Sequence, residues 1–201
     1  MKMKSWVAAA LLIALVGAIP VVAADEKETG KKASDQKAMM DAWMKTMTPG
    51  EQHKKLEPFV GSFDVKVTSW MVPGAPAAES SGSAEDRWVL GGRYVQEMFD
   101  GQFMGRPFSG IGYTGYDNIK KAFVSTWMDN MSTAIMMTKG SMEGNTMTSS
   151  GTMDDPMSGR SQQVTNKVTV TDNDHHMMEM WGPGPDGNMF KMMEISYARK
   201  K

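Results

Sequence analysis

Apolar and polar residues alternate along much of the chain after residue 59. Between positions 63 and 68, Phe63, Val65 and Val67 alternate with polar neighbours, which is the two-residue period of a strand buried on one face. Turn-forming sequences then recur at intervals of roughly 10 to 15 residues, with no helical pattern between them. This spacing predicts an antiparallel meander of about ten strands.

A flat sheet of that size would expose long edges and an apolar face, so it should close into a barrel or fold into a sandwich. Glycines at 110, 112 and 115 indicate sharp bends within a strand, which closed barrels need. We therefore expect a mainly β fold. Residues 59–201 should form a closed antiparallel up-and-down barrel of about 8–10 strands, preceded by one or two short N-terminal helices.

A helical pattern precedes the strands. The apolar positions Met40, Trp43, Met44 and Met47 lie at i, i+3, i+4 and i+7. Thr48 as N-cap and Glu51 as its capping-box partner predict a second helix, which Pro58 ends. This helical preface, 36–58, is too small to fold alone. We expect it to pack on the barrel through the stripe that contains Trp43.

The first residues have the order of a secretory signal peptide. Lys2 and Lys4 precede an apolar run at 6–22, which ends in small residues, and charged residues follow at once. We expect residues 1–24 to be cleaved and residues 25–35 to form a flexible leader. The mature chain would be periplasmic or secreted by a bacterium. After cleavage no further segment is apolar and long enough for stable membrane insertion.

Composition narrows the function classes. The 201 residues include 22 basic and 23 acidic side chains, a balance that argues against nucleic-acid partners. Cysteine is absent, which removes thiol catalysis, thiolate metal sites and disulfides. The chain also lacks a recognisable nucleophile–base pair, so an enzymatic function is disfavoured, and no cofactor is expected.

Methionine is unusually abundant, with 23 residues. Clustered thioethers beside histidine would suit Cu(I), and His176, Met178 and Met180 share one face of a strand. The alternative is that methionine fills core positions as an adaptable apolar side chain, as the helical stripe suggests.

The stretch from Leu56 to Phe63 places a short helix before a Gly-x-aromatic entry into the first strand. In this it resembles the lipocalin-like, or calycin-type, barrels, although Trp is usual where Phe63 stands. Those folds often carry a cation near the end of the last strand. The resemblance implies that Arg199 packs on the ring of Phe63, a cation–π contact worth ~0.5–2 kcal/mol.

A second resemblance covers nearly the whole mature chain. Its motifs, in order, are Thr48-Pro49-Gly50-Glu51-Gln52-His53, Leu90-Gly91-Gly92-Arg93, Gly105-Arg106-Pro107-Phe108-Ser109-Gly110, Gly115-Tyr116-Asp117-Asn118, Ser125-Thr126-Trp127-Met128-Asp129, Asp155-Pro156-Met157-Ser158-Gly159 and Met193-Glu194-Ile195-Ser196-Tyr197-Ala198-Arg199. Together they resemble the bacterial domain-of-unknown-function family 1579, to which no activity is assigned. The calycin-type barrels that this family resembles mostly bind small apolar or amphipathic ligands.

Candidate ligand-binding residues follow from this expectation. The aromatic side chains expected to line the interior are Phe108, Tyr113 and Trp127. Asp129 shares a face with Trp127 at a strand end, where it could contact a ligand at the rim or only form a turn. Glu179 could line the interior with a raised pKa or lie in solvent. Alternation along the last strand does not by itself decide whether Glu194 faces the interior or the solvent.

His53 in the short helix could face the mouth of the barrel or bond to nearby backbone. The function that we expect is non-enzymatic binding of a small hydrophobic or amphipathic ligand inside the barrel. The alternatives are a periplasmic, methionine-rich protein that binds copper or buffers oxidants, and a structural barrel without a ligand. The sequence does not fix the oligomeric state.

Overall fold

The computed structural model describes residues 26–155 and 158–201. The predicted signal peptide, 1–24, lies outside the described residues. The helical elements are α1 (Glu26–Met47), α2 (Glu51–Lys54) and the 3-10 helix η1 (Glu57–Phe59). Among the described residues, no helix has both the length and the hydrophobicity that a membrane span requires.

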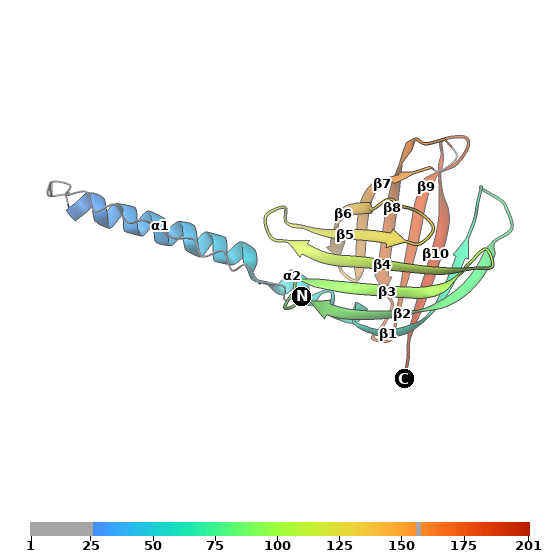
Figure 1. Cartoon of the computed structure of the whole chain (residues 1–201), viewed down its shortest axis with the longest axis horizontal. Helices are drawn as coiled ribbons and strands as arrows, with labels where there is room; N and C mark the ends of the chain where they lie inside the picture. The colour runs from blue at the N-terminus through green and yellow to red at the C-terminus, as the bar shows by residue number, and fades with distance from the viewer. Residues whose placement is uncertain (1–25, 156–157) are drawn as a thin grey trace, which may run out of the picture. The chain divides into compact units, whose positions relative to one another are not determined.

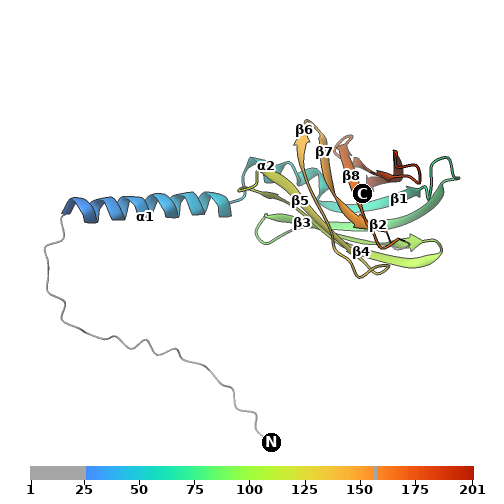
Figure 2. The ribbon, with the colours of Figure 1, turned by 90° about the horizontal axis from the view of Figure 1, so that it is seen from above.

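Ten strands follow the helices in the described part of the chain. They are β1 (Gly61–Ser69), β2 (Ala78–Val89), β3 (Tyr94–Phe103), β4 (Arg106–Asp117), β5 (Ala122–Asp129), β6 (Met136–Glu143), β7 (Thr146–Asp154), β8 (Ser161–Val170), β9 (His175–Pro183) and β10 (Met189–Arg199). Each pairs antiparallel with its neighbours in sequence, and β10 pairs with β1 to close the barrel (Figures 1 and 2). The predicted closed up-and-down barrel is confirmed.

Strand alternation divides the side chains between an inner and an outer face. Phe63, Val65 and Val67 of β1 are buried, as their two-residue period predicts. They pack inside the barrel with Ala84, Phe99 and Tyr197. We call this group, with the partly buried Phe108, Trp127, Met178, Met193 and Ile195 against it, the central cluster.

A second cluster seals one end of the barrel. Its buried members are Leu56, Phe59, Val95, Phe123 and Met147. Leu56 and Phe59 come from the segment that carries α2 and η1, which lies at this end in Figures 1 and 2. The cover of the barrel is therefore made by residues directly before β1.

The packing of the helical preface on the barrel through the Trp43 stripe stays a prediction. Trp43 is 60% exposed and Met47 is 41% exposed. Two side chains of the barrel bind backbone carbonyls at the end of this segment. Asn118 donates from Nδ2 to the carbonyl of Thr48 at 2.9 Å, and Arg93 donates from Nη2 to the carbonyl of Met47 at 2.6 Å. The part of α1 up to Ala42 forms a separate unit.

The helices also begin and end differently from the prediction. The first helix begins at Glu26, so it includes most of the expected flexible leader, and the N-cap of α2 is Gly50 rather than Thr48. The Thr48 hydroxyl donates back to the carbonyl of Met44 at 2.8 Å, so it helps to end α1. His53 completes the start of α2, because its Nδ1 accepts the Gly50 N–H at 3.1 Å.

Arg199 lies over the ring of Phe63, the contact that the calycin resemblance implies. Its Cζ is 4.7 Å from the ring centroid. Its Nη1 and Nη2 donate to the carbonyls of Val60 at 2.6 Å and Pro58 at 2.9 Å. This side chain therefore fastens the end of β10 to the segment that seals the barrel.

Candidate functional site

A pair of carboxyl side chains lies inside the barrel. Asp86 of β2 and Glu97 of β3 are direct cross-strand partners, and both share the inward face with buried apolar neighbours. The hydroxyl of Tyr197, on β10, donates to Glu97 Oε1 at 3.0 Å. Two acids and a phenol are thus held together by three strands.

The surroundings of this group favour its uncharged form. Burial, together with the nearby carboxyls of Glu97 and Glu85, raises the pKa of Asp86 to about 9, although Arg199 opposes the shift. Burial also raises the pKa of Glu97 and that of Tyr197. At neutral pH the Asp86 carboxyl is protonated, whereas a carboxyl group exposed to solvent would be ionised.

Three inward polar atoms have no hydrogen-bond partner within the described part of the chain. They are Asp86 Oδ1, Thr138 Oγ1 and Asn166 Oδ1, from β2, β6 and β8. All three residues are at least nine-tenths buried. A buried polar group without a partner costs about 1–3 kcal/mol. The interior therefore has unused hydrogen-bonding capacity on several sides.

An aromatic wall stands beside the carboxyl pair. Gly112 of β4 pairs with Glu97 on one side and Trp127 on the other, so the carboxyl and the indole are separated by one glycine in the sheet. The indole lies against Gly110 as well, where an added Cβ would be 2.2 Å from the ring. Phe108 stacks on Trp127 with centroids 6.5 Å apart and planes 15° apart.

The wall carries its own polar group at the strand end. Trp127 donates from Nε1 to Asp129 Oδ2 at 3.0 Å, and Asp129 Oδ1 accepts from the backbone N–H groups of Met131 and Ser132. Asp129 therefore both forms the turn and orients the indole. Glu97, Phe108 and Trp127 face inward and yet remain half-buried rather than fully buried, so part of their surface is accessible.

The structure brings three of the predicted ligand residues together and separates the others. Phe108, Trp127 and Asp129 share the inner face. Tyr113 lies on the outer face, where its hydroxyl accepts from Gln96 Nε2 at 2.7 Å. The alternation of β4 accounts for this, because Tyr113 is one residue away from the inward Gly112.

Glu179 also lies on the outer face, as does Glu194, its cross-strand partner. Lys191 Nζ bonds to both carboxylates, at 3.2 Å to Glu179. A register shift between Lys191 and Met193 places Lys191 on the same face as Glu194 while Met193 stays in the central cluster. These charges form a surface network rather than an interior acid pair.

His53 is buried at the sealed end of the barrel. Its ring meets that of Tyr116 edge-on, with centroids 5.9 Å apart. Burial and the charge of Arg93 lower the pKa of His53. It serves the local backbone at Gly50, which was the alternative reading of this residue.

The candidate copper ligands share the inner face, but the histidine is enclosed by rings. His176 stacks on Tyr197 with centroids 4.2 Å apart, and it meets Phe63 edge-on at 4.9 Å. Burial lowers the pKa of His176 to about 4, so it is neutral at pH 7. Met178 and Met180 lie in or beside buried apolar packing. Over residues 26–155 and 158–201, no cluster of three or more His, Cys, Asp or Glu residues could hold a metal ion.

Sequence reasoning missed Asp86, Glu97 and the role of Tyr197. A signal for Glu97 was present, since it lies between Val95 and Phe99 on the apolar face of an alternating strand. The pairing of Glu97 with Asp86 depends on the β2–β3 register. Its bond to Tyr197 depends on closure of the barrel.

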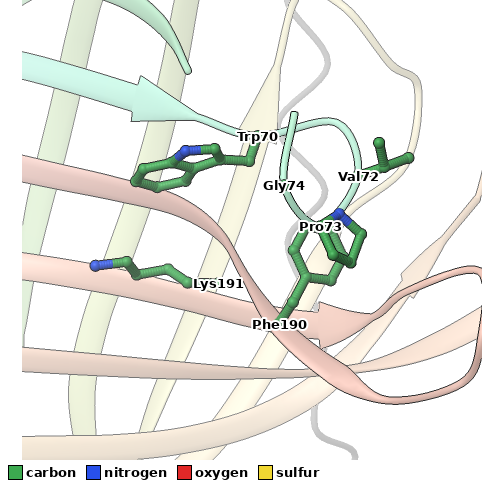
Figure 3. Close-up of a pocket in the computed structure, with 6 residues that line it drawn as sticks. All are labelled: Trp70, Val72, Pro73, Gly74, Phe190 and Lys191. Atoms are coloured by element: carbon green, nitrogen blue, oxygen red, sulfur yellow. The ribbon is translucent and has the colours of Figure 1, made fainter. Parts of the chain in front are cut away.

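Two further grooves are found in the described part of the chain. One has a volume of about 270 Å³ and is almost wholly apolar, formed by Trp70, Val72, Pro73, Gly74, Phe190 and Lys191. In Figure 3, Trp70 lies above Lys191 and Pro73 lies over Phe190. The other, of about 430 Å³, lies over β1, β9 and β10 beside His175. Neither gathers unpartnered buried polar atoms, so the interior is the better candidate site.

The fold is shared with a solved bacterial protein. The crystal structure of Rv2717c from M. tuberculosis superposes with a TM-score of 0.56 at 13% sequence identity, covering 77% of this chain and 100% of that one. No match was found among curated protein sequences. The model of a family described as a protein of unknown function, DUF1579, matches residues 48–199. Since this match includes every strand and most of the described residues, the chain belongs to the DUF1579 family.

Proposed function

We propose that this protein is an exported, non-enzymatic binding protein that holds one small hydrophobic or amphipathic ligand inside its barrel. The observation that carries the proposal is the set of three buried, unpartnered polar atoms on the inner face of the barrel, the face that also carries the Trp127–Phe108 wall. A ligand with an apolar body and a polar end would pack on the rings and supply the missing hydrogen bonds. The order of residues 1–24 supports export.

The inner residues suit binding better than structural packing alone. A barrel selected only for stability would gain from apolar residues at Asp86, Thr138 and Asn166, because each unpartnered atom costs free energy. A bound ligand would form hydrogen bonds to these atoms and so remove that cost. The partial accessibility of Trp127 and Phe108 leaves an apolar surface for it to cover.

A fluorescent apolar probe tests the proposal. We expect 1-aminoanthracene to bind the full chain saturably and to quench tryptophan emission. Trp127→Ala should weaken binding by about tenfold, since an aromatic contact of this size contributes about 1–2 kcal/mol. Trp43→Ala is the matched control, because Trp43 is exposed on α1. Absence of saturable binding, or an equal effect of the two variants, would contradict an interior site.

A further inference from the structure

We propose that the interior site selects a protonated amine on an apolar body, with the ammonium group held by Asp86 and Glu97. This inference rests on the proposed function and names the ligand class for that same site. It follows from the two carboxyls inside the barrel, from the unpartnered polar atoms on the inner face, and from the aromatic side chains beside Glu97.

The first argument is that the two carboxyls lack a cation. Within the described ranges, neither Asp86 nor Glu97 forms an ion pair, and the one hydrogen bond to either side chain comes from the neutral hydroxyl of Tyr197. Arg199 influences Asp86 electrostatically, yet its donors are directed to Val60, Pro58 and the Asn173 carbonyl. An ammonium would supply one counter-charge, which lets the Asp86 carboxyl ionise in the interior.

The second argument comes from atoms that do not belong to the acid pair. Asn166 Oδ1 and Thr138 Oγ1 are buried and unpartnered, and they face inward from β8 and β6. An ammonium has three donors and no acceptor. Asn166 and Thr138 lie on strands four places from β2 in the closed order, so they are suitable partners for donors elsewhere on the ligand rather than for the ammonium that Asp86 and Glu97 hold.

The third argument is the aromatic wall. Trp127 follows Glu97 in the sheet with only Gly112 between them, and Phe108 stacks on its ring. Aromatic faces attract cations, and they also cover an apolar ligand body. A carboxylate ligand would add a third acid at this place and would supply no counter-charge with which the pair could ionise.

Binding of an ammonium changes the protonation of the pair. Asp86, with a pKa of about 9, holds a proton at pH 7, and that proton must leave when the cation takes its place. The groups around it are Glu97 and Glu85, which raise its pKa, Arg199, which lowers it, and Tyr197, which is itself neutral. His176, stacked on Tyr197, is also neutral. Affinity for the amine should therefore increase with pH until the amine itself loses its charge.

Three probes of one shape test the inference by calorimetry on the full chain: 2-phenylethylamine, 2-phenylethanol and 3-phenylpropanoate. We expect the amine to bind at least about tenfold more tightly than the alcohol, and the carboxylate to bind weakest. Titration at pH 7 in phosphate and in Tris should show release of about one proton per amine bound, and none for the alcohol. This readout needs no variant.

Variants locate the selectivity. Asp86→Asn and Glu97→Gln should each reduce the preference for the amine over the alcohol by about tenfold, while the affinity for the alcohol stays within about twofold. The control is Glu79→Gln, which removes a carboxyl from an exposed position of the same strand.

The outcomes separate the two proposals. Equal binding of amine and alcohol, tighter binding of the carboxylate, or binding of the amine without proton release overturns the inference and leaves the ligand-binding function standing. Failure of all three probes and of 1-aminoanthracene to bind contradicts the proposed function, and the inference with it.

Discussion

The hydroxyl of Tyr197 on β10 donates a 3.0 Å hydrogen bond to the carboxyl of Glu97 on β3. These strands are not neighbours in the sheet, because β1 and β2 lie between them in the closed order. The bond therefore joins separate parts of the barrel wall through its interior. It fixes the one hydrogen-bonded member of the carboxyl pair.

Tyr197→Phe tests what this bond contributes. The variant keeps the ring that stacks on His176 but leaves the Glu97 carboxyl buried without its donor. We expect the free energy of unfolding to fall by about 1–3 kcal/mol, measured by urea titration. The control is Tyr113→Phe, whose hydroxyl bonds to Gln96 on the outer face and should cost less than about 1 kcal/mol. Equal losses in the free energy of unfolding of the two variants would show that the bond to Glu97 stabilises the fold no more than the bond on the outer face.

The buried acid Asp86 predicts a loss of stability at alkaline pH. Its pKa rises from 3.8 in the unfolded chain to about 9 in the folded one, so the folded state binds the proton more tightly. The stability that depends on a protonated Asp86 is fully present below about pH 4 and is lost as pH rises toward 9. Asp86→Asn removes the titrating group. Melting temperatures of the wild type should fall between pH 5 and 9 relative to those of the variant, and parallel curves would refute the assignment.

The buried His176 predicts a loss of stability at acid pH, opposite to the alkaline loss predicted from Asp86. Burial lowers the pKa of His176 from 6.5 to about 4, so the folded state disfavours the charged ring. The stability that depends on a neutral His176 is present above pH 6.5 and is lost as pH falls toward 4. His176→Phe should lessen the acid sensitivity of the melting temperature between pH 6.5 and 4. His175→Phe removes only an exposed ring that pairs with Asp172, so it should change the acid sensitivity less than His176→Phe does.

Replacing Gly61 by alanine should disturb the packing of Arg199. The φ of Gly61 is +144°, and a Cβ there would lie 2.1 Å from Nη1 of Arg199. Gly61→Ala should therefore displace the guanidinium from the carbonyls of Pro58 and Val60, and we expect a loss of about 2 kcal/mol or more in urea unfolding. Gly74→Ala also has positive φ but meets open space. A similar loss in both variants would mean that backbone strain alone, and not Arg199, sets the cost.

The sequence predicted the barrel because its pattern is local and repeated. The alternation at Phe63, Val65 and Val67 and the recurring turns determine strands and their connections, and closure follows from the need to remove edges. The nearness of Trp127 and Phe108 was likewise accessible, since both stand at inward positions of adjacent strands.

The rest depended on parity and register, which one sequence leaves open. Tyr113 faces outward because of its offset from Gly112, and the shift before Met193 carries Lys191 to the outer face with Glu179. Such shifts come from tertiary packing rather than from local preference. The choice of the residues that cover the barrel end also depends on tertiary packing. The stripe at Trp43 satisfies a helical period, but Leu56 and Phe59 are the residues that reach the barrel core.

The central claim is that the barrel interior holds a small ligand. Native mass spectrometry of the protein purified from its own host, under non-denaturing conditions, tests this most directly. We expect one additional small mass per chain in the wild type, lost on denaturation and diminished in Trp127→Ala. A wild-type spectrum with only the mass of the bare polypeptide, from protein that also fails to take up an added apolar probe, would contradict it.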